Sequence, residues 1–278
     1  MTDNYIDSYY TATAIGIGDP QLATTDYRCD VCVIGAGFTG VSTALHLAES
    51  GYDVILLEAN RIGWGASGRN GGQLHSGQRK GQEELEKLFG RNRAHELWQL
   101  AEESKSMVKS RILKHNIDCD YKSGLLHAAY KLTDVKDFET EVSKLQQDYN
   151  YEHVRFVAKE EMSEMLGTDV YHGGILDSSA GHLHPLNYVL GLARAARQAG
   201  VRMFEHSPVT EIGQSDPATI KTPTGCVKAS YIVLACNGYL GKLNKKMAAR
   251  IMPINNFIIA TTIHNIHMIM SAFCYNNI

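Results

Sequence analysis

Residues 30–73 read DVCVIGAGFTGVSTALHLAESGYDVILLEANRIGWGASGRNGGQ and hold two glycine-rich segments on either side of an apolar run. The first segment, Gly35 to Gly40, follows the short apolar run Val31–Ile34 and precedes apolar residues at helical spacing that end before Gly51. This order predicts a buried parallel strand, a tight turn and a helix from about residue 41 to residue 50.

Each glycine of the G-x-G-x-x-G pattern has a physical reason. Gly35 permits the tight turn, Gly37 lets the backbone approach a pyrophosphate, and Gly40 lets the helix pack closely on the strand. The helix amides that begin at Phe38 and Thr39 then face the anion. The segment therefore predicts a dinucleotide site.

The second apolar run, YDVILLEA, predicts another strand that ends in Glu58. An acid at this point accepts hydrogen bonds from ribose hydroxyls and repels a 2'-phosphate. The cofactor is therefore expected to be FAD or NAD rather than NADP.

The second glycine-rich segment, Gly63 to Gly77, is too rich in small residues to form a long helix or strand, so its backbone is expected to approach a ligand. FAD explains two such segments because its pyrophosphate lies far from its ring. An NAD-dependent dehydrogenase remains an alternative, but it would leave the second segment without a purpose.

The motif EANRIGWGASGRNGG, directly after the second predicted strand, resembles the flavin-binding loop of the FAD-dependent D-amino-acid oxidase (DAO) superfamily. The resemblance implies FAD as cofactor. It implies contacts to the ADP and pyrophosphate part from Arg61, Gly65, Ala66 and Ser67. It implies contacts to the flavin ring from Gly72, Gln73 and Leu74.

The resemblance also assigns roles to two later segments. A strand over Ser207–Ile212 would contribute main-chain contacts from about Val209 to the adenine. Ala235 and Gly238, at the end of another buried strand, would pack against the pyrophosphate side, with Cys236 as a packing residue.

The expected fold class is α/β: a Rossmann-like FAD-binding domain of the GR2/DAO type with an inserted α+β substrate domain, incomplete at the C-terminus. The expected boundaries are an N-terminal arm over 1–28, an FAD-binding domain over 29–80 and 182–250, a partial substrate domain over 81–181 and 251–261, and an aberrant tail over 262–278. Within the substrate domain, two helical pieces broken near Gly90 and a charged helix over 133–150 are predicted.

The low-polarity pocket that amine oxidation needs has four candidate residues, Gln73, His75, His182 and His184, any of which could instead be structural. We name no general base. No metal site is expected, since His182 and His184 have no third ligand beside them in the sequence. Cys29 and Cys32 form a C-x-x-C, but in a strand their sulfurs would point to opposite faces.

Within the superfamily, CDVCVIGAGFTG, ASGRNGGQ and GHLHPLN are similar to segments of the bacterial gamma-glutamylputrescine oxidoreductases. That likeness implies oxidation of the amine C–N bond of gamma-glutamylputrescine in putrescine catabolism. A hydride passes to flavin N5, the imine is hydrolysed to an aldehyde or keto product, and O2 reoxidises the flavin to give H2O2. The alternatives are the NAD-dependent dehydrogenase above and an inactive fragment that retains some nucleotide affinity.

Net charge and composition restrict the classes of partner that the chain is expected to bind. The 278 residues carry a net charge of -3 without a basic cluster, which favours a small-molecule amine and O2 over nucleic acid. No run is long and apolar enough for a membrane span, and the N-terminus lacks signal-peptide character, so a cytoplasmic location is expected. The oligomeric state is left open.

The end of the chain departs from the pattern of the superfamily, whose members are longer. No charged residue follows Arg250. We therefore expect a C-terminal truncation, with a frameshift after about residue 261 as its origin.

Overall fold

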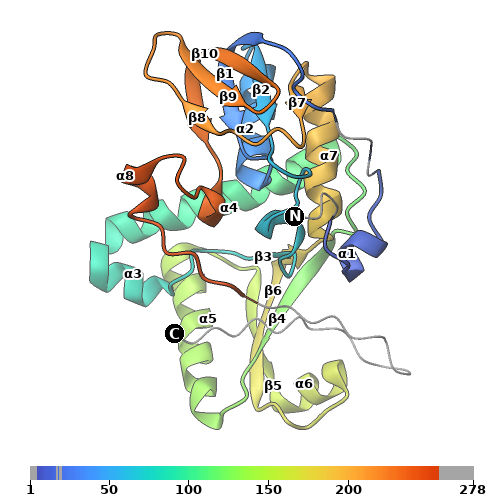
Figure 1. The fold of residues 1–278 in the computed structure, drawn as a ribbon. Helices are drawn as coiled ribbons and strands as arrows, with labels where there is room; N and C mark the ends of the chain where they lie inside the picture. The colour runs from blue at the N-terminus through green and yellow to red at the C-terminus, as the bar shows by residue number, and fades with distance from the viewer. Residues whose placement is uncertain (1–4, 17, 19–20, 257–278) are drawn as a thin grey trace. The chain divides into compact units, whose positions relative to one another are not determined.

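The fold is described from a computed structural model, in which residues 5–16, 18 and 21–256 are placed well enough to describe. These residues form two compact units. The first takes its residues from 1–70, 111–119 and 184–256, and the second from 71–110 and 120–183. Figure 1 shows the chain passing between them more than once. The expected tail over 262–278 lies outside the described residues.

The first unit is built on a six-stranded sheet in the order β7-β2-β1-β10-β9-β8. The strands β7, β2, β1 and β10 run parallel, whereas β9 and β8 continue antiparallel. The strand bounds are β1 (Tyr27–Ile34), β2 (Val54–Leu57), β7 (Arg202–Phe204), β8 (Glu211–Ile212), β9 (Ala218–Thr222) and β10 (Gly225–Leu234).

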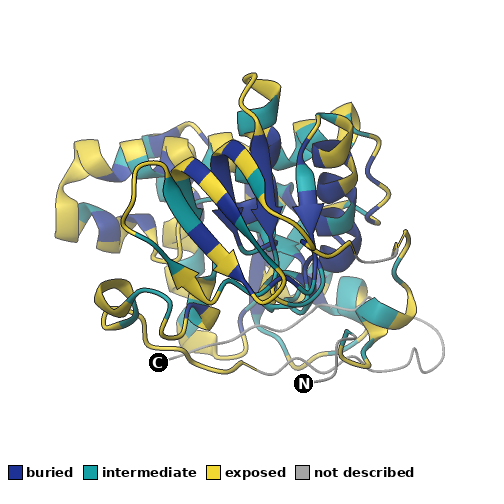
Figure 2. Cartoon of the chain, turned by 45° about the horizontal axis from the view of Figure 1, so that its top comes forward, coloured by how far each residue is buried: buried dark blue, intermediate teal, exposed yellow. Residues whose placement is uncertain are grey.

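Apolar side chains on both faces explain why β1 and β2 lie in the middle of this sheet. All four residues of β2 are buried, and so are Val31, Cys32, Val33 and Ile34 at the end of β1. Successive residues of a strand point to opposite faces, so such a run requires cover on both sides. Figure 2 shows these buried residues along the central strands.

Helices α2 (Phe38–Glu49) and α7 (Pro185–Gln198) pack on each other, and α2 contacts β1 and β2. Pro185 stands in the first turn of α7, where its missing N–H costs no hydrogen bond. The remaining elements of the first unit are short: α1 (Tyr9–Ala12), α8 (Lys245–Ala248) and the 3-10 helices η1 (Ala66–Gly68) and η2 (Asn237–Tyr239).

The second unit contains a sheet in which β6 pairs with β3, β4 and β5, all antiparallel. Trp98, Val142, Leu145 and Tyr149 help to form its apolar core. Its elements are β3 (Gln73–Leu74), α3 (Gln82–Phe89), α4 (Arg91–Lys114, whose last residues belong to the first unit), β4 (Lys122–Ala128), α5 (Leu132–Tyr149), β5 (Val154–Ala158), α6 (Lys159–Leu166) and β6 (Gly173–His182).

The structure confirms the predicted mixed α/β class and the main elements. Helix α2 begins at Phe38, three residues before the predicted start, and the helix break between α3 and α4 falls at Gly90, whose φ is +81°. The two units divide the chain differently from the expected domains, since residues 71–80 belong to the second unit and 111–119 to the first.

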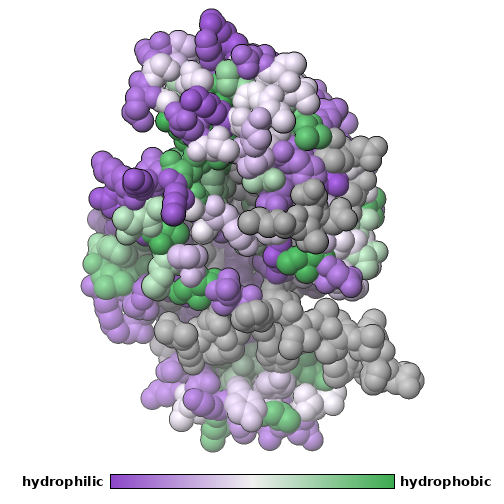
Figure 3. All heavy atoms as spheres, in the orientation of Figure 1, coloured by the Kyte–Doolittle hydropathy of each residue, from purple (hydrophilic) through white to green (hydrophobic). Residues whose placement is uncertain are grey.

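Two expectations about local structure are wrong. The predicted strand over Ser207–Ile212 is reduced to Glu211–Ile212, and the chain bends just before this range at His206, whose φ is +48°. On α4, the helical spacing of Leu100 and Met107 with the other apolar residues predicts that both lie in the core, yet they are 57% and 49% exposed. Figure 3 shows hydrophobic atoms at the surface in the region of α3, and on that helix Leu88 and Phe89 are also exposed.

Candidate functional site

The first glycine turn joins the end of β1 to the start of α2. Gly35 has a φ of +102°, which residues with a side chain rarely adopt. A Cβ on Gly37 would lie 2.7 Å from Ser67 Oγ, and a Cβ on Gly40 would overlap the carbonyl oxygen of Gly35. The turn therefore presents bare backbone where α2 begins.

The N-terminus of α2 has the chemistry of an anion site. Gly37 is its N-cap and supplies no side chain to the first-turn amides. The Phe38 N–H donates to Ser67 Oγ at 2.9 Å. The N–H groups of Thr39 and Gly40 belong to the first turn, where a helix offers no internal acceptor and its dipole favours negative charge. The turn therefore fits a pyrophosphate.

Glu58 closes the turn from the end of β2. Its carboxylate accepts the Ala36 N–H at 2.7 Å and the Asn60 N–H at 2.9 Å. Burial raises the pKa of this carboxyl, although the bond from Ala36 acts against the rise. Carboxylate oxygens can accept more than one hydrogen bond each, so Glu58 retains capacity for ribose hydroxyls.

The second glycine-rich segment is bonded directly to the first. The Gly63 N–H donates to the Ala36 carbonyl at 2.9 Å, and Ser67 accepts the Phe38 N–H described above. Gly63 also lies against Leu186 and Val189 of α7, where a Cβ would collide with Val189. The part of the second segment in the first unit therefore forms one site with the glycine turn.

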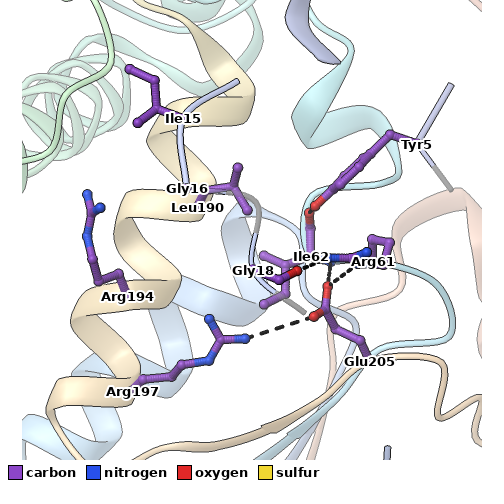
Figure 4. Close-up of a pocket in the computed structure, with 10 residues that line it drawn as sticks. All are labelled: Tyr5, Ile15, Gly16, Gly18, Arg61, Ile62, Leu190, Arg194, Arg197 and Glu205. Carbon is purple, nitrogen blue, oxygen red and sulfur yellow. Dashed lines mark hydrogen bonds and ion pairs between the residues drawn. The ribbon is translucent and has the colours of Figure 1, made fainter. Parts of the chain in front are cut away.

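Arg61 does not extend freely from this site. Its Nε donates to Glu205 Oε1 at 3.0 Å and its guanidinium also donates to the Gly18 carbonyl. Figure 4 shows these contacts beside a cavity of about 110 Å³ between the N-terminal arm and α7. Contact of Arg61 with FAD stays a prediction; the structure shows it engaged by the protein.

The site residues predicted after β7 and β10 also belong to the first unit. The Ala235 N–H donates to the Ile34 carbonyl at 2.8 Å, and the Ala235 carbonyl borders Gly35. Gly238 lies in η2, and Val209 packs against the apolar core of the sheet. Cys236 places its Sγ 3.4 Å from the Ile34 carbonyl, and burial raises its pKa, as expected of a packing residue.

The residues predicted to face the flavin ring belong to the second unit. Gln73 and Leu74 form β3, which pairs with β6 so that Gln73 lies opposite His182. The Gly72 carbonyl accepts the Leu183 N–H at 2.9 Å. Of the four pocket candidates, the structure therefore brings Gln73 and His182 together.

The other two histidine candidates have distinct surroundings. The ring of His75 lies edge-on to that of His127, with centroids 5.3 Å apart, and burial lowers the pKa of both. His184 belongs to the first unit, where its Nδ1 accepts the Asn187 N–H at 3.1 Å and caps α7. Its Nε2 lies 3.0 Å from Thr13 Oγ1, so both ring nitrogens have protein partners.

One polar cluster in the second unit was not foreseen. Lys105, 2% exposed, donates to Ser76 Oγ at 2.6 Å and to the Tyr151 hydroxyl at 2.9 Å, and pairs with Glu102 at 2.8 Å. Asp177 accepts from both Ser76 and Tyr151, at 2.5 and 2.8 Å. Although burial disfavours its charge, these hydrogen bonds lower the pKa of Asp177.

The sequence held one signal for this cluster. Lys105 stands seven residues after the buried Trp98, so a helix places both on one face. A lysine on the apolar face of a helix needs buried acceptors.

Taken together, a parallel strand, a glycine turn, a helix and an acid at the next strand define a dinucleotide-binding α/β protein. Residues 30–275 match the family model described as FAD dependent oxidoreductase (DAO). The chain belongs to this family, whose members depend on FAD. The bare turn, the acceptor Glu58 and the second glycine segment fit that cofactor.

Curated relatives cover nearly the whole chain. It is 39% identical over 262 residues to gamma-glutamylputrescine oxidoreductase of Escherichia coli, covering 94% of this chain and 61% of that protein. It is 42% identical over 250 residues to a probable oxidoreductase of Haemophilus influenzae, covering 87% and 57%. The chain thus spans about three fifths of the length of these relatives.

Solved structures share the fold. Glycine oxidase from Geobacillus kaustophilus superimposes with a TM-score of 0.67 at 21% identity, covering 80% of this chain and 58% of that one. L-proline dehydrogenase from P. horikoshii gives 0.66 at 20% identity, covering 81% and 56%. Among the described residues, no helix has both the length and the apolar character needed to cross a membrane.

Proposed function

We propose that this chain carries the cofactor-binding part of an FAD-dependent oxidoreductase that oxidises the C–N bond of an amine or amino acid. The observation that carries the proposal is the direct bonding of two glycine-rich segments, through Gly63 to Ala36 and Phe38 to Ser67, beside Glu58. A mononucleotide would need only the first of these segments. The family match supports FAD over NAD.

The residues of the first unit would bind and orient the cofactor. The amides of Thr39 and Gly40 would hold the pyrophosphate, and Glu58 would accept the ribose hydroxyls. Main-chain groups near Val209 would meet the adenine, and Ala235 and Gly238 would border the pyrophosphate. Bound FAD supplies the acceptor for a hydride from the carbon next to nitrogen, with O2 as final oxidant.

The residues of the second unit would serve the substrate. Gly72, Gln73 and Leu74 would face the flavin ring, with His75 and His182 at the pocket. The lowered pKa of His75 favours its neutral form at pH 7, which adds no positive charge against an amine. We name no general base.

We propose gamma-glutamylputrescine as the substrate, in putrescine catabolism. The support is the 39% identity to the relative of that name. A cytoplasmic location forms part of the proposal, since the five described cysteines are free. A second candidate is FAD binding without turnover, which needs only the glycine turn, Glu58 and the second glycine segment bonded to that turn.

Absorbance spectroscopy tests the proposal. The purified chain supplied with FAD should retain flavin bands near about 370 and 450 nm after gel filtration. Anaerobic gamma-glutamylputrescine should bleach the 450 nm band faster than putrescine, sarcosine or glycine does. The Gly37→Val variant is the control, because its side chain would fill the turn beside Ser67.

The outcomes separate the candidates. A yellow parent protein bleached by another amine would keep the reaction and replace the substrate. A yellow protein bleached by none of these amines would favour FAD binding without turnover. A colourless parent protein would overturn the flavin assignment.

A further inference from the structure

The N-terminal arm, described over residues 5–16, 18 and 21–25, contacts Ile62, the residue directly before the second glycine segment. The Tyr5 hydroxyl donates to the Ile62 carbonyl at 2.7 Å. The Ile62 N–H donates to Glu205 Oε1 at 2.8 Å. Both polar groups of Ile62 are therefore held, one by the arm and one by the residue after β7.

This contact lies one residue from the joint between the two glycine segments. Gly63, which follows Ile62, donates its N–H to Ala36 in the first turn. Ile62 itself is 2% exposed, so its main chain has little room to relax if a partner is lost. A shift of the Ile62 carbonyl would therefore move the Gly63 bond that joins the segments.

A cluster of charged side chains lies beside Ile62. Glu205, 3% exposed, pairs with Arg61 at 3.0 Å and lies 4.0 Å from Arg197 of α7. The Arg61 guanidinium lies 5.6 Å from the centroid of the Tyr5 ring, within cation–π range. Figure 4 shows Tyr5, Arg61 and Glu205 converging on Ile62.

The arm has a separate anchor further along the chain. Thr13 Oγ1 lies 3.0 Å from His184 Nε2, and the Ile15 N–H donates to Asn187 Oδ1 at 2.8 Å. The Tyr10 ring packs on that of His184 with centroids 5.0 Å apart. The arm is thus fixed to α7, the helix that also borders Gly63, so Tyr5 is not an isolated contact.

We propose that Tyr5 is a positioning residue for the cofactor, acting through Ile62 and the Arg61–Glu205 ion pair to hold the second glycine segment against the first. The inference rests on the proposed function in taking FAD as the ligand. It gives the arm a part in cofactor affinity, although Tyr5 need not touch the cofactor itself.

The test compares two single-atom changes in the whole 278-residue chain. Tyr5→Phe removes the hydroxyl that holds Ile62, and Tyr9→Phe makes the same change at a ring that is 57% exposed. FAD is titrated into each apoprotein by quenching of flavin fluorescence. We expect Kd to rise about five- to tenfold for Tyr5→Phe, the effect of one partly buried hydrogen bond, and to stay unchanged for Tyr9→Phe.

A second readout excludes a merely structural role. Amide hydrogen exchange of residues 59–69 in the apoprotein should quicken in Tyr5→Phe and not in Tyr9→Phe, and excess FAD should restore the protection. An unchanged Kd for Tyr5→Phe, with or without a lower melting temperature, overturns the inference while the parent's FAD binding upholds the proposed function. A parent that binds no FAD overturns both.

Discussion

The glycine turn of the first unit and the Lys105 cluster of the second unit hold their polar groups in opposite ways. Around the first glycine turn, the bonds run between main-chain groups or from main chain to a short side chain, as for Gly63 to Ala36 and Phe38 to Ser67. In the second unit, the buried cluster consists of side chains that meet across the fold, with Lys105 and Asp177 bridged by Ser76.

This difference decides which substitutions each of the two sites can tolerate. A site made of backbone requires the absence of side chains at fixed places, so one added methyl group can close it. A site made of buried charges requires every partner to remain, so the loss of one leaves another uncompensated.

Gly40→Ala should have the largest effect. Its Cβ would overlap the main-chain carbonyl oxygen of Gly35, and a Cβ has no torsion of its own by which it could turn away. We expect unfolding free energy to fall by about 4 kcal/mol, with loss of retained FAD. Chemical denaturation of this variant beside Gly81→Ala, whose Cβ meets nothing within 4 Å, provides the measurement. Equal stability of the two variants would contradict a backbone-built site.

Because the first glycine turn is built from backbone, much of the first unit can be predicted from sequence. Gly35, Gly37 and Gly40 each mark a place where the backbone must approach something closely, and Glu58 follows from its position after an apolar run. These signals are local in the sequence, so they can be recognised without knowing how the chain packs. The contacts of Arg61 do not follow from them, because Glu205 lies 144 residues away.

Lys105→Met tests the side-chain cluster. The change keeps an unbranched chain of similar length but leaves Glu102 and Asp177 without their buried cation. We expect a loss of about 3 kcal/mol in unfolding free energy, measured by denaturant titration.

Two further variants sharpen that result. Lys136→Met, at an exposed position of α5, is the matched control and should change stability little. Adding Asp177→Asn to Lys105→Met should recover part of the loss, because it removes a carboxylate that no longer has a cation. Two losses that simply add would show that the residues act independently.

Side-chain clusters of this kind are where sequence reasoning stops. Ser76, Tyr151 and Asp177 lie in three separate segments, and no spacing relates them. The exposure of Leu100 has a similar origin, since helical periodicity identifies a face but not what covers it. The histidine candidates show the same limit: His184 was a pocket candidate, yet it caps a helix.

The ring of His127 should make the stability of the second unit fall in acid. Burial lowers the pKa of His127 in the folded chain, so the unfolded chain binds a proton first as pH falls. The stability contribution is full above about pH 6.5 and is lost as pH falls below that value toward the folded pKa. His127→Phe keeps a ring beside His75 and should reduce the fall in melting temperature between pH 7 and 5. The resulting change in unfolding free energy should be smaller than the loss expected for Lys105→Met. A steeper fall would contradict the direction of the pKa shift.

The smallest effect should come from an ion pair that lacks burial. Lys87 and Glu83 pair on α3 with side chains 71% and 65% exposed. Water screens such charges, so Lys87→Ala should leave the unfolding free energy unchanged within the error of the titration. The measurement uses the same denaturant titration as Lys105→Met, in the same unit and with the same charge removed. If Lys87→Ala matched Lys105→Met, burial would not be what makes the cluster sensitive, and the contrast between the backbone-built glycine turn and the charge-built Lys105 cluster would lose its basis.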